Sequence, residues 1–263
     1  MKNDPTILLT FDIEEFDLPL EYNIPIPLEE QFETGRKGLA SIEKVVASQG
    51  IQTTMFITGR FALQYPANIN ELSAHHEIAS HSFSHTSFEE VDLLKSRLTL
   101  ENITGKPVIG LRMPRMKAVS MQSVIAGGYE YDSSINPTNL PGRYNNRHLP
   151  RVFYKDKGML RLPISVTPNF RIPLFWLSFK NFPYKLYKKL ALQTLRKDSY
   201  LSIYFHNWEF TDVSRYPLPA YVTRHSGNIL IDKLNTLIID LKKEAEFASI
   251  ENYIKKRIDL KAL

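Results

Sequence analysis

Four clusters of polar side chains in this sequence combine residue types that can do chemistry. The first holds three carboxylates within four positions, in LLTFDIEEF (residues 8–16). The second, HSFSH (residues 81–85), places two histidines four positions apart. The third, LRMPR (residues 111–115), has two arginines, and the fourth, YFHNWE (residues 204–209), has a histidine and a glutamate. Carboxylates and imidazoles are the side chains that hold catalytic metal ions and transfer protons.

The histidine pair, His81 and His85, predicts a metal site. If the segment is helical, the two rings lie on one face and can share one cation. The spacing alone is weak evidence, because two surface or core histidines can have it too. A carboxylate at the end of the first strand strengthens the prediction, since two His and one carboxylate form a common catalytic metal shell. With no cysteine in the chain, we predict a divalent metal, Zn²⁺ first, with Co²⁺, Ni²⁺ or Mn²⁺ as alternatives.

The acidic cluster holds more carboxylates than one metal ion needs. Of Asp12, Glu14 and Glu15, one can bind the metal while another accepts a proton from water whose pKa the metal lowers. A solvated loop would explain one acid more easily than three. Arg112 can orient the base, although a structural ion pair is the commoner role of an arginine near acids. His206 can act as a general acid, although a histidine that ends a strand is more often structural.

Each cluster follows a predicted strand, in a chain where strands and helices alternate. Buried strands are predicted over residues 6–14, 52–58, 76–82, 108–114, 159–165 and 200–206. Helices are predicted over residues 35–50, 88–102, 121–128 and 229–246. This order predicts a parallel sheet or barrel, whose active site lies at the C-terminal edge of its strands. We therefore expect the four clusters to meet at one rim.

The charge of the chain is uneven. The 263 residues carry a net charge of +5 and suit one α/β domain. Residues 142–197 alone carry a balance of +12, which leaves about −7 elsewhere. Lysines and arginines alternate there with aromatic side chains, which suits a sugar or an anionic partner. A helical hairpin packed on the barrel is an equal alternative. We predict no nucleic-acid partner, because a basic pI without a binding motif is weak evidence.

Hydropathy favours a cytoplasmic location. The N-terminal apolar run is too short for a signal peptide and carboxylates follow it at once. We find no stretch of the roughly 18 uninterrupted apolar residues that indicate a membrane span. Residues 169–192 set Trp176 and several phenylalanines beside lysines. This mixture is typical of peripheral contact with a membrane or anionic lipid.

The four clusters resemble the motifs of the polysaccharide deacetylase family, the NodB-homology type of carbohydrate esterase family 4. TFDIEE (residues 10–15) is similar to its first motif, HEIASHSFSH (residues 76–85) to its second, LRMPR to its third and YLSIYFH (residues 200–206) to its last. GYEYDSSINPT (residues 128–138) and LRLPIS (residues 160–165) resemble segments of the subgroup that acts on peptidoglycan-like or cell-envelope sugars.

The resemblance implies one catalytic domain over residues 1–263, with a basic and aromatic insertion around residues 135–197. The implied fold is an α/β, distorted (β/α)7 barrel of the NodB-homology type. The implied activity is metal-dependent removal of acetyl from an N-acetylated amino sugar, such as N-acetylglucosamine. The substrate is a polysaccharide, peptidoglycan, or a lipid-linked or nucleotide-linked precursor.

The resemblance also implies roles for the motif residues. His81 and His85 match metal ligands. Asp12 matches the catalytic base, with Arg112 as its orienting partner and His206 as the general acid. The third ligand is expected to be Glu14, with Glu15 as its rival, because Ile13 stands where the family has a second aspartate.

Further roles follow from the same resemblance. Asp132 is the nearest candidate for a catalytic carboxylate that relatives often have between the third and last motifs. Arg115 stands where relatives have an aromatic residue, and Tyr204 where leucine is usual. The expected substrate-binding residues are Ser82, Pro114, Arg115, Tyr204 and Trp208.

Two alternative functions remain open at this stage. The first is hydrolysis of small amides or ureides on the same barrel, as in allantoinase-like relatives, some of which lack a metal. The second is a sugar-binding module that has lost catalysis, which the replacement at Ile13 permits. Metal analysis distinguishes the first alternative from a deacetylase, and acetate release distinguishes the second.

Overall fold

A curled, largely parallel sheet organises the chain in the computed structural model, which describes residues 5–257. Within these residues seven neighbouring strands form one continuous parallel run, which confirms the predicted barrel class. In spatial order they are β10 (Tyr200–His206), β1 (Thr6–Ile13), β2 (Thr54–Ile57), β3 (Glu77–Ser80), β4 (Gly110–Leu111), β5 (Tyr131–Asp132) and β9 (Met159–Arg161).

Four further strands complete the β-structure of the described residues. β8 (Tyr154–Asp156) is antiparallel to β9, and β11 (Glu246–Phe247) pairs with the start of β1. β6 (Asn139–Leu140) and β7 (Tyr144–Asn145) form a separate hairpin. The chain after β9 links the two ends of the curled sheet: Leu162 N–H donates to Asp132 O, and Ser165 N–H donates to Ser202 O, both at 2.9 Å. The barrel is distorted because isolated hydrogen bonds, and not a continuous β-ladder, connect β9 to β10.

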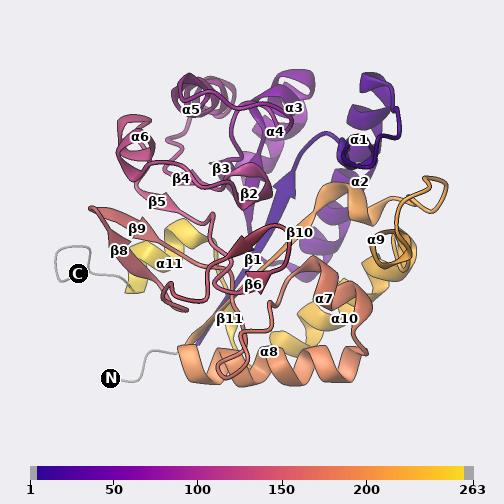
Figure 1. The fold of residues 1–263 in the computed structure, drawn as a ribbon, viewed down its shortest axis with the longest axis vertical. Coiled ribbons are helices and arrows are strands. Elements are labelled where there is room, and N and C mark those ends of the chain that lie inside the picture. The colour runs from indigo at the N-terminus through magenta and orange to yellow at the C-terminus, as the bar shows by residue number, and fades with distance from the viewer. Residues whose placement is uncertain (1–4, 258–263) are drawn as a thin grey trace.

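Helices surround this sheet (Figure 1). They are α1 (Leu18–Glu21), α2 (Leu28–Gln49), α3 (Gly59–Gln64), α4 (Pro66–Ser73), α5 (Val91–Thr104), α6 (Met121–Ala126), α7 (Trp176–Asn181), α8 (Tyr184–Asp198), α9 (Ala220–Thr223), α10 (Asn228–Leu241) and α11 (Ile250–Arg257). Two 3₁₀ turns, η1 (Pro114–Met116) and η2 (Asn207–Phe210), follow β4 and β10. Within the described residues, no helix is long and apolar enough to cross a membrane.

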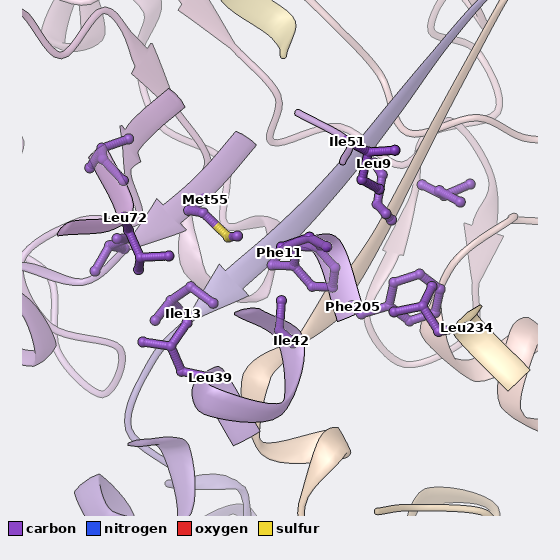
Figure 2. Packing of buried hydrophobic residues seen from close by; sticks show 14 of the residues in the cluster. Leu9, Phe11, Ile13, Leu39, Ile42, Ile51, Met55, Leu72, Phe205 and Leu234 are labelled. Atoms are coloured by element: carbon purple, nitrogen blue, oxygen red, sulfur yellow. The ribbon is translucent and has the colours of Figure 1, made fainter. Parts of the chain in front are cut away.

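The core lies between the sheet and its outer helices. Every residue of β1 is buried, as the run of apolar and β-branched residues predicts. Figure 2 shows Phe11 and Ile13 of β1 beside Leu39 and Ile42 of α2, with Phe205 of β10 close by. This packing fixes the ends of β1 and β10, where the polar clusters begin.

Two glycines let α2 approach the same strand ends. A Cβ on Gly38 would lie 1.9 Å from Asn207 O, and one on Gly35 would lie 2.5 Å from Glu14 O. The prediction that this helix begins at residue 35 is therefore wrong, because the glycines serve close packing inside a helix that starts at Leu28. The helix predicted over 229–246 ends at Leu241, because residues 246–247 pair with β1 instead.

Candidate active site

The strand ends bring the polar clusters together, as expected. Asp12 and His206 are direct partners in the register of β1 and β10. His81 follows β3, and Arg112 follows β4. Arg112 spans the barrel and donates from Nη1 to Asp12 Oδ1 at 2.7 Å. Parallel strands end at one edge of the sheet, so residues about a hundred positions apart meet there.

Glu14, His81 and His85 form the candidate metal centre, with one ligand atom of each lying within 4.8 Å of the others. Glu14 Oε2 lies 3.2 Å from His81 Nε2 and 3.1 Å from His85 Nε2. This buried oxygen has no hydrogen-bond partner among the described residues. Ligand atoms about 2.0–2.1 Å from one ion lie roughly 3 Å apart, so the three groups fit a small divalent cation.

The other ring nitrogens fix the tautomers of both histidines. His81 Nδ1 lies 2.8 Å from Arg112 O, and His85 Nδ1 lies 2.7 Å from Asp17 Oδ1. A carbonyl or carboxylate oxygen only accepts, so each Nδ1 carries the proton. Each Nε2 is thereby left with a lone pair facing Glu14, as metal-binding histidines require.

The loop geometry of the histidine pair differs from the helical placement that the sequence suggested. Residues 81–87 are not helical. Ser82 has a φ of 62°, in the left-handed region, which reverses the chain between the two histidines. His81 and His85 therefore face the same carboxylate from a loop.

Glu14, and not its rival Glu15, reaches the histidines. Trp208 Nε1–H donates to Glu14 Oε1 at 3.0 Å, which turns Oε2 towards the rings. Glu15 Oε2 instead accepts a hydrogen bond from Thr58 at 2.9 Å. The structure thus distinguishes the two acids that the sequence left as alternatives.

The charges of the candidate ligands shift the pKa values of one another. Burial acts to raise the pKa of Glu14, but His85, His81 and His206 outweigh it and hold that pKa well below its usual range. Burial acts to lower the pKa of His85, but Glu14 and Asp17 raise it to about 9. The charge of Glu14 therefore favours positive charge at the two Nε2 atoms, which either a proton or a bound cation can supply.

Arg112 positions Asp12 from within the barrel. Its guanidinium is fully buried over the face of Phe56, with the carbon 4.0 Å from the ring centroid. It also donates to Thr10 Oγ1 at 2.9 Å and to Ser133 Oγ at 3.0 Å. Asp12 Oδ2 is left 4.0 Å from His81 Nε2. One carboxylate oxygen is thus held by arginine, and the other faces the candidate metal centre.

His206 lies on the other side of the site and belongs to a buried charge network. Its Nδ1 lies 3.1 Å from Glu209 Oε1, and Glu209 Oε2 lies 3.3 Å from Lys180 Nζ. Both Lys180 and Glu209 are fully buried. Burial acts to lower the pKa of His206, but the Glu209 hydrogen bond and the charge of Glu14 outweigh it and raise that pKa.

Arg115 is directed at protein groups. It donates to Asp17 Oδ2 at 3.1 Å, to His85 O at 2.9 Å, and to Glu21. Asp17 is the carboxylate that holds His85, so Arg115 supports a metal ligand through it. Arg115 itself has a φ of 55°, a left-handed conformation that these bonds hold in place. Its predicted contact with substrate stays a prediction.

Five predicted site residues do not line the cavity. Two of them, His81 and Arg112, are buried behind it and contact Glu14 and Asp12. Asp132 accepts from Ser134 Oγ and pairs with Arg161 Nε at 2.9 Å, on the wall of a separate hollow. Burial raises the pKa of Asp132, against the charge of Arg161. Ser82 and Pro114 are buried, and neither is among the described residues that line the cavity.

A cavity of about 300 Å³ opens over the candidate metal centre. Asp12, Glu14, His85 and His206 reach it, so the charged groups share one space. Trp208 stacks on the His206 ring at 5.0 Å between centroids. The remaining aromatic lining residues are Tyr22, Tyr144, Phe175, Trp176, Tyr204 and Tyr221. Aromatic faces beside a few convergent polar groups are typical of a site for an organic ligand.

The basic and aromatic stretch contributes to this cavity through α7. Trp176 meets the His206 ring edge-on at 5.1 Å. Phe179 and Tyr187 pack into the core, while Phe170 is 77% exposed. Most of these aromatic rings therefore pack inward, and contact with a membrane stays a prediction.

Sequence reasoning missed several groups that support the site. Asp17 lies beyond the first motif, although it is the last of the four acids within residues 12–17. Glu209 lies in the quoted fourth cluster, three positions after His206, which was its only signal. No sequence signal marked Lys180, because its burial comes from packing between α7 and α9.

Comparison with known proteins agrees with this fold. The fold is that of the NodB-type deacetylase barrels. Residues 1–122 match the family model described as polysaccharide deacetylase, which confirms the resemblance of the first three motifs. The fourth cluster, with His206, lies outside the matched residues. No curated protein matches the sequence.

Solved structures of three kinds share the fold. A probable polysaccharide deacetylase from Pseudomonas aeruginosa has a TM-score of 0.67 at 15% identity, covering 96% of this chain and 91% of that one. An allantoinase has a TM-score of 0.65 at 16% identity, covering 96% and 91%. A pseudoenzyme of carbohydrate esterase family 4 from Bacillus anthracis has a TM-score of 0.54 at 11% identity, covering 96% and 66%. At these identities the structures establish the fold and leave the activity to the site.

Proposed function

We propose that this protein is a metal-dependent N-deacetylase of amino sugars. It hydrolyses the acetamide bond and releases acetate and a free amine. The observation that carries the proposal is the buried Glu14, His81 and His85 group beside the Arg112–Asp12 pair, with His206 across the same cavity. The set supplies a cation site, a proton acceptor and a proton donor within one space.

The chain's own residues have separable tasks. Asp12 accepts the proton of the attacking water at Oδ2, while Arg112 holds Oδ1. His206 donates its Nε2 proton to the leaving nitrogen, because Glu209 holds Nδ1–H. Glu14, His81 and His85 hold the cation, for which Zn²⁺ is the first choice. That cation supplies a Lewis acid for the carbonyl oxygen and acidifies water. One water is consumed, and the C–N bond is the bond that breaks.

The substrate class follows from the aromatic lining. Flat apolar rings such as Trp176 and Tyr144 suit the faces of a sugar ring, and polar groups at the base suit its acetamide. We propose an N-acetylated unit such as N-acetylglucosamine, in a polysaccharide, peptidoglycan or a lipid-linked or nucleotide-linked precursor. A cytoplasmic enzyme with peripheral membrane contact would meet such precursors, and flotation with anionic vesicles at low and high salt tests that contact.

The deciding experiment measures acetate release with Zn²⁺ and with chelator, using the native sequence, His81→Ala and His75→Ala. The panel contains chito-oligosaccharides, peptidoglycan fragments and nucleotide-linked N-acetylglucosamine. His75 is the matched control, because it is exposed and lies before β3, away from the site. We expect chelator-sensitive release that is lost with its metal in His81→Ala and kept in His75→Ala. Unchanged metal content in His81→Ala would reject the ligand assignment.

The alternatives predict other results in the same assay. An allantoinase-like hydrolase would release no acetate and would act on allantoin, a substrate to include in the panel. A catalytically inactive sugar-binding module would bind N-acetylglucosamine without turnover. The buried Glu/His/His group favours the metal-dependent enzyme over both, since a metal-free or inactive site does not need three preorganised ligands.

A further inference from the structure

The walls of the cavity come from five separate segments. They are α1 with the turn after it, η1 with the residue before it, the β6–β7 hairpin, α9, and α7 with the chain that leads into it. In Figure 1, α1 lies above α9 on the same side of the molecule, although about two hundred residues separate them. None of these segments belongs to the barrel sheet itself, so their arrangement is free to set access to the site.

Each wall is bonded to the next. Arg143 of the hairpin donates to Glu21 of α1 at 2.9 Å. After α1, the hydroxyl of Tyr22 lies 3.3 Å from that of Tyr221 in α9. α9 is joined to α7, because Asn181 Nδ2 donates to Tyr221 O at 2.9 Å. These three links connect the hairpin to α7 by way of α1 and α9.

The remaining side of the mouth is closed by the approach to α7. Thr138, just before the hairpin, donates to Arg171 O at 2.7 Å. Arg171 in turn donates from Nη1 to Pro137 O at 3.0 Å. These bonds join the segments that line the cavity into one closed chain of contacts, and Arg115 of η1 is bonded to Glu21 of α1 as well.

A ring of this kind has a consequence for a polymeric substrate. An internal sugar unit reaches a catalytic centre only along a groove that is open at two ends, because the chain continues on both sides of it. A ringed cavity of about 300 Å³, at the small end of the range for ligand sites, admits a unit from one direction only.

From this geometry we infer that the site is a blind pocket that accepts a single or chain-terminal acetamido sugar and excludes internal units of a glycan. The inference deepens the proposed function and rests on it for the acetamido group. The rest of a longer ligand leaves through the mouth, past Arg143 and Tyr144 of the hairpin. The hairpin is then the element that determines specificity.

The test compares N-acetylglucosamine with its linear β-1,4 pentamer. The position of each free amine in the pentamer is read by tandem mass spectrometry. We expect the zinc-loaded native protein to deacetylate the single sugar and one end unit of the pentamer, with internal units slower by about tenfold or more. Equal rates at end and internal units would overturn the inference.

A hairpin variant makes the test specific. Pro141 and Arg143, at the tip of the hairpin, are both replaced by glycine, which removes the Arg143–Glu21 link and leaves the pairing of Leu140 with Tyr144 in place. We expect internal units of the pentamer to become substrates, while the rate on the single sugar changes little. The matched control is Arg215→Ala, which removes an exposed arginine outside the ring. Internal units that stay excluded in the hairpin variant would show that the ring does not control access.

Failure of the proposed function is distinguishable from failure of this inference. If no acetate is released, saturation-transfer NMR with the same two sugars reports which acetyl methyl groups touch the zinc-loaded protein. Saturation confined to one end unit of the pentamer supports the blind pocket, although the deacetylase proposal then fails. Saturation along all five units, or no binding of either sugar, overturns the pocket as well.

Discussion

The two sides of the cavity are built in different ways. On the side of β1, β3 and β4, the groups are short polar clusters that follow strand ends, and Arg112 ties them together through the barrel. On the other side, His206 also ends a strand, but its supports Glu209, Lys180 and Trp176 come from a 3₁₀ turn and from α7. The first side holds the proposed metal ligands and base, while the second holds the proposed general acid and the aromatic rings beside it.

This difference explains what the comparisons match. The family model covers residues 1–122, which contain the candidate ligands and base, but of the walls of the cavity only α1 and η1. Strand ends are held by the core packing of Figure 2, so residues there are positioned by the fold itself. Segments such as the hairpin and α7 are held by a few bonds of their own and can differ without disturbing the barrel.

The largest effect is expected at the base. Asp12→Asn keeps the shape and the Arg112 contact but removes the proton acceptor, so kcat should fall by roughly 10²- to 10⁴-fold. Glu15→Gln is the matched control, because Glu15 is equally buried and lies in the same cluster but bonds to Thr58. Steady-state acetate release and metal content are the measurements. A loss of kcat in Glu15→Gln as large as in Asp12→Asn would break the assignment of separate roles.

A smaller effect, on metal affinity, is expected at Arg115, which contacts the candidate ligand His85 through Asp17. Arg115→Met frees Asp17, which no longer holds His85 Nδ1 as firmly, so Zn²⁺ affinity should fall by about tenfold or somewhat more. Competition with a zinc chelator dye measures the affinity without reference to any activity. Arg143→Met is the matched control, since Arg143 shares the Glu21 contact but does not touch Asp17. Equal affinity in all three proteins would contradict the support of His85 through Asp17.

The sequence predicted the first side of the cavity better than the second for a physical reason. Strand-end motifs such as TFDIEE and HSFSH are contiguous, and the topology of a parallel barrel brings such ends together. The clusters therefore predict that Asp12, His81, His85 and Arg112 lie close together. The choice of Glu14 over Glu15 needed the Trp208 bond, which joins residues 194 positions apart.

The position of Asp132 also has a local cause, and its catalytic role stays a prediction. Asp132 ends a strand like the other acids, but Arg161 on the neighbouring strand β9 draws it into a separate ion pair. The sequence pattern does not indicate which of several arginines an aspartate will contact. The sequence also did not predict the mouth of the cavity. The segments around it are joined by individual hydrogen bonds and share no motif.

The smallest effect is expected on the second side, where Glu209 holds the general acid. The protonated form of His206 is the active one, so activity is full below its pKa and is lost as the pH rises through it. Glu209 raises the pKa of His206, against burial. Glu209→Gln should therefore move the alkaline loss of kcat to lower pH and cost about tenfold or less at neutral pH. The pH profile is the measurement, with the surface variant Glu33→Gln as control.

A second variant separates this effect from simple loss of folding. Glu209→Gln leaves the buried Lys180 without its counter-charge, which commonly costs about 3–5 kcal/mol of stability. Adding Lys180→Met removes that unpaired charge, so thermal stability should recover in the double variant. The alkaline limb should stay shifted, because the hydrogen bond to His206 is still altered. If the alkaline limb of the pH profile moves back to its original position when stability recovers, Glu209 acts through packing alone. The proposed difference between the two sides of the cavity would then be wrong.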